Sequence, residues 1–130
     1  MGRMMIVYHY TSKQSFDEII GTNQFKPSDP WTTMDARFGE GWYFTDLGPN
    51  TCDMAIMYHC WKDTSVLERV EYYLKFDIDN SILESHREHV FMVALGKWNS
   101  NLIKYLAGSA MTTCPSKPCA TCETGKIYRI

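Results

Sequence analysis

Alternating apolar and polar side chains mark the strands of this chain. Residues 4–10 are rich in β-branched and aromatic side chains, which predicts a first strand. The clearest alternation runs over residues 69–79 and predicts a half-buried strand with one apolar face. The apolar members of that face are Val70, Tyr72, Leu74, Phe76 and Ile78. Residues 41–46 and 89–95 predict two further strands.

Other segments carry apolar residues at helical spacing. Thr11 or Ser12 caps a first helix, with Gln14 placed three after Thr11 as in a capping box, and Gly21 ends it. Residues 50–61 predict a second helix and residues 101–107 a short third one. Short strands are expected at 24–27 and 126–130, and a loop over 28–40. This irregular order favours an α+β fold with antiparallel pairing, in a single domain over residues 1–130.

Length and charge narrow the class of protein. The chain has 130 residues, of which 45% are hydrophobic, and this is ample for one packed core. A formal net charge of −2 gives no general attraction to nucleic acid or to an anionic membrane. No apolar run approaches the roughly 20 residues that span a bilayer, and the first ten residues do not form a signal peptide. We therefore expect a soluble, cytoplasmic monomer without a membrane partner.

The five cysteines are unevenly placed. Cys52 and Cys60 fall in the second predicted helix, whereas Cys114, Cys119 and Cys122 cluster near the C-terminus. An odd number without a signal peptide argues against a disulfide framework, so free thiols are expected. The alternatives are a zinc site, which would need a fourth ligand such as His59 or Cys60, and a redox pair. We expect no bound metal.

Two short motifs carry the candidate chemistry. The first is the strand end Tyr8-His9-Tyr10-Thr11-Ser12, where His9 and Thr11 share a face because side chains alternate along a strand. Such a polar pair can hold a ribose diol or an amide, although a buried structural histidine beside a capping threonine fits the same residues. The second is the strand after Gly39 and Gly41, where Tyr43 offers a ring on which a flat heterocycle could stack. Aromatic core residues and glycine turns are the alternative interpretation.

Together, His-x-Thr-Ser, a helix, a Pro-Ser loop and Gly-x-Gly-x-Tyr-Phe-Thr-Asp resemble the ADP-ribosyltransferase superfamily, above all its small toxin-type His-Tyr-Asp class. The resemblance is best over residues 8–49 and looser to residue 79. It implies two small, mostly antiparallel sheets that form an NAD cleft with flanking helices. It also implies that His9 orients the ribose and nicotinamide amide of NAD, the substrate, while Tyr43 stacks on the nicotinamide. The other implied NAD-binding residues are Thr11, Ser12, Ser28, Arg37, Gly39, Gly41 and Phe44.

An acidic residue should complete this site. Cleavage of the nicotinamide–ribose bond passes through an oxocarbenium-like state, which a nearby carboxylate stabilises. The candidates are Asp79, which fits the class pattern better, and Asp77, both on the polar face of residues 69–79. Asp46 is expected to be structural. The chain has no Glu-x-Glu or Gln-x-Glu pair, which departs from the arginine-modifying branch of the superfamily.

Two classes of function follow. The first is an enzyme that cleaves NAD and transfers ADP-ribose to a protein, a nucleic acid, a small molecule or water. The second is a catalytically inactive or zinc-organised binding module. Retention of His9, Tyr43 and acidic candidates together favours the enzyme.

Overall fold

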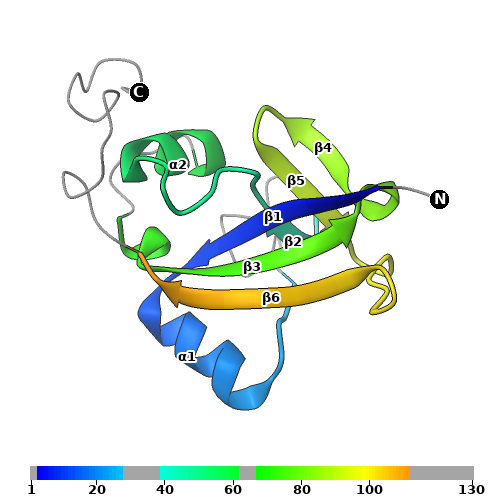
Figure 1. Ribbon diagram of the computed structural model, residues 1–130, viewed down its shortest axis with the longest axis horizontal. Coiled ribbons are helices and arrows are strands. Elements are labelled where there is room, and N and C mark those ends of the chain that lie inside the picture. Colours follow the sequence, from blue (N-terminus) through cyan, green and yellow to red (C-terminus); the bar gives the residue numbers. More distant parts are fainter. Residues whose placement is uncertain (1–2, 28–38, 62–66, 112–130) are drawn as a thin grey trace.

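A computed structural model describes residues 3–27, 39–61 and 67–111 of the chain. Within them, two three-stranded antiparallel sheets pack together with two helices (Figure 1). The first sheet has the order β1-β3-β6, from β1 (Met4–Thr11), β3 (Tyr72–Asp79) and β6 (Ile103–Ala110). The second has the order β2-β5-β4, from β2 (Gly41–Phe44), β5 (Val90–Ala94) and β4 (Glu84–Arg87). This arrangement is the expected α+β class with antiparallel pairing.

The register of β1 on β3 decides which side chains share a face. His9 lies opposite Leu74, and Met4 lies opposite Asp79 at the far end of the pair. Residues directly opposite in an antiparallel pair point to the same side of the sheet. One face of the first sheet therefore carries His9 with the buried apolar side chains of β3, and the other carries Tyr8, Tyr10 and the acidic residues of β3.

Each face of this sheet has its own apolar cluster. The His9 face packs against the second sheet and α1 (Lys13–Thr22), around a buried core of Val7, Phe44, Leu74, Phe76, Ile78 and Val93. The other face packs against α2 (Asp53–Trp61), where Tyr10 meets Ile56 and Met57. Figure 1 shows the two helices on opposite sides of the sheet. In the described part of the chain, neither helix is long and apolar enough to cross a membrane.

The first helix begins after Ser12, one of the two expected caps, and continues one residue past Gly21, to Thr22. Ser12 is its N-cap, and the Ser12 hydroxyl accepts a hydrogen bond from the Ser15 backbone N–H at 3.2 Å, so the predicted box of Thr11 and Gln14 does not form. Its C-cap is Asn23, whose φ of 57° lies in the left-handed region that Asn tolerates better than most residues. Gly21 lies inside the helix instead of ending it.

Two other predictions of secondary structure are wrong. Residues 24–27 form no strand, and the predicted helix over 101–107 is the start of strand β6 and the turn before it. Strand β4 was not predicted at all. Two 3-10 helices, η1 (Leu67–Val70) and η2 (Asn80–Ile82), flank β3, and η1 contains the first two residues of the strand expected over 69–79. The expected loop over 28–40 falls mostly outside the described residues, and the expected strand over 126–130 does so entirely.

Cys52 corrects the expectation of free thiols, because it is disulfide-bonded. Whether two cysteines pair depends on the distance between them in the fold, which sequence spacing does not give. Cys60, in α2, keeps its thiol. Cys114, Cys119 and Cys122 lie outside the described residues. Within those residues, no group of three His, Cys, Asp or Glu side chains is placed to hold a metal ion.

Candidate active site

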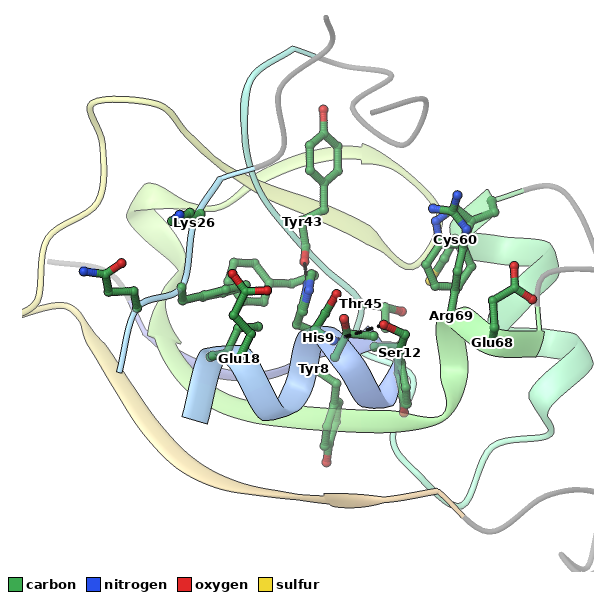
Figure 2. Close-up of a pocket in the computed structure, with 18 of the residues that line it drawn as sticks. Tyr8, His9, Ser12, Glu18, Lys26, Tyr43, Thr45, Cys60, Glu68 and Arg69 are labelled. Atoms are coloured by element: carbon green, nitrogen blue, oxygen red, sulfur yellow. Dashed lines mark hydrogen bonds between the residues drawn. The ribbon is translucent and has the colours of Figure 1, made fainter. Parts of the chain in front are cut away.

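A pocket of about 520 Å³ opens where the C-terminal end of β1 meets α1, β2 and η1. That volume lies within the usual range for small-molecule sites. His9, Thr11, Ser12, Tyr43 and Phe44, five of the residues singled out from the sequence, line it. Figure 2 shows His9 in the middle of the pocket, with the Tyr8 ring pointing in the opposite direction, as the alternation along β1 requires.

His9 is held by the main chain of residue 43. Its Nδ1 lies 2.8 Å from the Tyr43 carbonyl oxygen, and because a carbonyl only accepts, Nδ1 carries the proton and donates. The imidazole also contacts the Phe25 ring edge-on, with 4.7 Å between ring centroids, and the Phe44 ring at 6.3 Å. These contacts fix the plane of the ring. Its other nitrogen, Nε2, is left with a lone pair that can accept a hydrogen bond from a ligand.

Burial keeps His9 neutral. Removal of the imidazole from water lowers the pKa of His9 below its ordinary value of 6.5, and this outweighs the opposite effect of its bond to the Tyr43 carbonyl. The neutral ring at pH 7 is therefore the tautomer with the proton on Nδ1. In chemical terms, His9 is an oriented acceptor suited to a ribose hydroxyl or an amide N–H.

The Tyr43 ring extends from β2 on the side away from the core. Its neighbours Trp42 and Phe44 belong to the apolar cluster between the sheets, so alternation directs Tyr43 outward. Its hydroxyl donates a hydrogen bond to the Gly39 carbonyl. Figure 2 shows the ring pointing away from His9, so the structure joins the two residues through the Tyr43 backbone and not through their rings.

The other NAD-binding candidates from the sequence belong to the core or to turns, or lie outside the described residues. Phe44 lines the pocket but is only 3% exposed and is mainly a core residue. Gly39 has a φ of +110°, which favours glycine, and a Cβ on Gly41 would lie 2.5 Å from the Val93 carbonyl oxygen. These two glycines thus serve a turn and a close strand contact, and neither lines the pocket. Ser28 and Arg37 lie outside the described residues.

The structure does not bring Asp77 or Asp79 to His9. Both lie on the opposite face of the first sheet, and Asp79 is five residues along β3 from the partner of His9, roughly 17 Å at the usual rise per residue. Asp79 is buried, and its carboxylate accepts a hydrogen bond from the Ser81 backbone N–H at 2.9 Å, which caps η2 and lowers the pKa of Asp79. Asp46, expected to be structural, lies 2.6 Å from Nδ1 of His89.

We therefore expect replacement of Asp79 by Asn to affect the fold and not the chemistry. Loss of a charged cap at a buried position should lower the melting temperature by several degrees, because the neutral amide oxygen of Asn is a weaker acceptor for the Ser81 N–H than a carboxylate. Thermal unfolding monitored by circular dichroism measures this. Asp77→Asn is the matched control on the same face. If the Asp79→Asn protein is folded but has lost its activity, Asp79 has a role in the active site and not only in the fold.

The pocket also contains charged residues that the sequence did not single out. Lys26 and Arg69 are its basic side chains, and Glu18 and Glu68 its acidic ones, among the described residues. Arg69 lies over the Trp61 ring, with 6.0 Å from its guanidinium carbon to the ring centroid. In Figure 2, Arg69, Glu68 and Cys60 gather at one end of the pocket and Lys26 lies at the other. One signal was present in the sequence, since Ser12, Ser15, Glu18 and Thr22 follow helical spacing and form a polar face of α1.

The described residues form a small α+β protein with a pocket lined by His9. Residues 7–102 match the family described as "HYD1 signature containing ADP-ribosyltransferase", and the chain belongs to this toxin-type family. The matched region begins in β1 and ends just before β6, and it includes both His9 and Tyr43. No curated protein and no solved structure matches the chain.

Proposed function

We propose that the protein is an NAD-dependent ADP-ribosyltransferase that breaks the nicotinamide–ribose bond in the pocket around His9. ADP-ribosyl transfer is the activity of the family. The observation that carries the proposal for this chain is the fixed tautomer of His9, which leaves the Nε2 lone pair able to accept a hydrogen bond from a ligand. The pocket has the volume for a nucleotide and basic side chains for a pyrophosphate.

Each pocket residue has a part in this proposal. The neutral His9 accepts a hydrogen bond from a ribose hydroxyl, and Thr11 beside it offers its own hydroxyl. The Tyr43 ring stacks on the nicotinamide. Arg69 and Lys26 contact the phosphates. The phenylalanine rings around His9 hold the imidazole in place before the substrate arrives, so little orientation has to be gained during the reaction.

Incubation of the purified protein with NAD labelled in its adenylate part tests the proposal. We expect release of nicotinamide together with labelled ADP-ribose, either free or attached to an added macromolecule. Free ADP-ribose indicates water as the acceptor, whereas label on protein or nucleic acid identifies the class of acceptor. An absence of nicotinamide release with both types of macromolecule present would refute the proposed function.

The pH dependence of the reaction provides a second test. His9 acts as an acceptor only when neutral, and burial lowers the pKa of His9, so kcat/KM should remain high as the pH falls to 6.5 and decline only below that value. The unfolded chain protonates this histidine near 6.5, so the free energy of unfolding should also fall as the pH drops from 6.5 towards the lower folded value. An NMR titration of the His9 ring measures its pKa directly. A value at or above 6.5 would contradict the neutral acceptor.

A further inference from the structure

The proposed reaction needs a carboxylate near the ribose, and the register of β3 keeps Asp77 and Asp79 away from it. Among the described residues that line the pocket, only Glu18 and Glu68 carry a carboxylate. Glu68 lies on η1 with Arg69, at the end of the pocket away from His9 (Figure 2). Glu18 belongs to α1 and projects toward the part of the pocket where His9 lies (Figure 2).

Packing of α1 supports this placement. Ile19, which follows Glu18, packs in the same apolar cluster as Phe25 and Phe44, the two rings that contact His9. Ser15 and Thr22, one turn before and one turn after Glu18, also line the pocket. The side of α1 that carries Glu18 therefore faces the imidazole across the pocket.

The Glu18 carboxylate is also available for a ligand. Its neighbour Asp17 is bound by Lys13 at 2.7 Å, an ion pair on the solvent side of the helix. Within the described part of the chain, no ion pair or side-chain hydrogen bond holds the Glu18 carboxylate. A ligand that fills the pocket would cover this exposed carboxylate, and an ion pair with a positively charged group is stronger once water is removed.

We propose that Glu18 is the catalytic carboxylate of this protein, a step that rests on the proposed function. In the reaction, the bond between ribose C1′ and the nicotinamide nitrogen breaks, and its electron pair leaves with nicotinamide. The positive charge that develops on C1′ and the ring oxygen lies next to the Glu18 carboxylate. Water or an acceptor hydroxyl then forms the new bond to C1′, and its proton passes to Glu18 and on to solvent. His9 and Glu18 thus contact the same ribose from opposite sides.

The test replaces Glu18 by Gln, which keeps the size and removes the charge. We expect kcat for nicotinamide release from NAD to fall about a hundredfold, the usual effect of removing one preorganised group, while KM and the affinity for ADP-ribose change little. Glu18→Asp should recover part of kcat because the charge is restored on a shorter side chain. Asp17→Asn, next to Glu18 on the exposed side, is the matched control, and Glu68→Gln tests the other carboxylate that lines the pocket.

Each outcome separates this proposal from the proposed function. If the wild-type protein releases nicotinamide and Glu18→Gln keeps the same kcat, Glu18 is not the catalytic carboxylate, while the proposed function stands. The same conclusion follows if Glu18→Gln changes KM alone. An equal loss in Glu68→Gln overturns the choice between the two carboxylates. A wild-type protein that binds ADP-ribose but releases no nicotinamide refutes the proposed function instead. Circular dichroism confirms folding, and because Glu18 is exposed, a loss of fold is not expected.

Discussion

Replacement of His9 by Ala is expected to lower nicotinamide release from NAD by roughly a hundredfold or more, the effect of losing one oriented transition-state contact. The variant lacks the Nε2 acceptor and leaves a void beside Phe25 and Phe44. His9→Gln is therefore needed as a second variant, because it fills most of the void without restoring the oriented imidazole. Steady-state kinetics under saturating NAD measure the effect.

His86→Ala is the matched control for His9. His86 lies on β4, outside the pocket, where its Nε2 is 3.1 Å from the Glu84 carboxylate. We expect wild-type turnover from this control. Wild-type turnover from a folded His9→Ala protein would remove the histidine from the mechanism.

Replacement of Tyr43 by Ala is expected to have an effect of similar size, about a hundredfold on turnover, if the ring forms the stacking surface for nicotinamide. The main-chain carbonyl of residue 43 remains in this variant, so the hydrogen bond to His9 is kept and the loss reports on the ring alone. Tyr43→Phe keeps the ring and loses the hydroxyl that bonds Gly39.

The two Tyr43 variants together distinguish stacking from hydrogen bonding. We expect Tyr43→Phe to retain most of the turnover and to lose a little thermal stability, measured by nicotinamide release and by thermal unfolding. If Tyr43→Phe is as inactive as Tyr43→Ala, the hydroxyl is the functional group and the stacking role is wrong.

Much of the fold could be predicted from the sequence because many elements carry their own signal. The alternation of β1 and β3 and the helical spacing of α1 and α2 are local patterns, and the structure confirms these elements with small changes at their ends. Strand β6 carries the opposite signal, since Leu102, Lys104, Leu106 and Ala107 suit a helix. Pairing with β3 overrides that propensity. Strand β4 has no apolar alternation of its own and exists through its pairing with β5.

The site was predictable in part for the same reason. His9 and Tyr43 belong to local motifs, and both line the pocket. The alternation over 69–79 correctly places Asp77 and Asp79 on one face of their strand, but it does not say which face of β1 they share. That depends on the register between two segments some 70 residues apart, in which His9 lies opposite Leu74. No sequence motif singles out Glu18, which lines the pocket through the packing of α1 on the first sheet.

The register of β1 also links correct assembly of the core to the position of His9 in the pocket. A slip of one residue would exchange the two faces of the strand, placing Tyr8 or Tyr10 where His9 stands and turning Val7 out of the core. A misaligned molecule would thus lose its core and its imidazole in the same event. The specific activity of a refolded sample, compared with that of protein never unfolded, should therefore report the fraction of chains that have joined their first and third strands correctly.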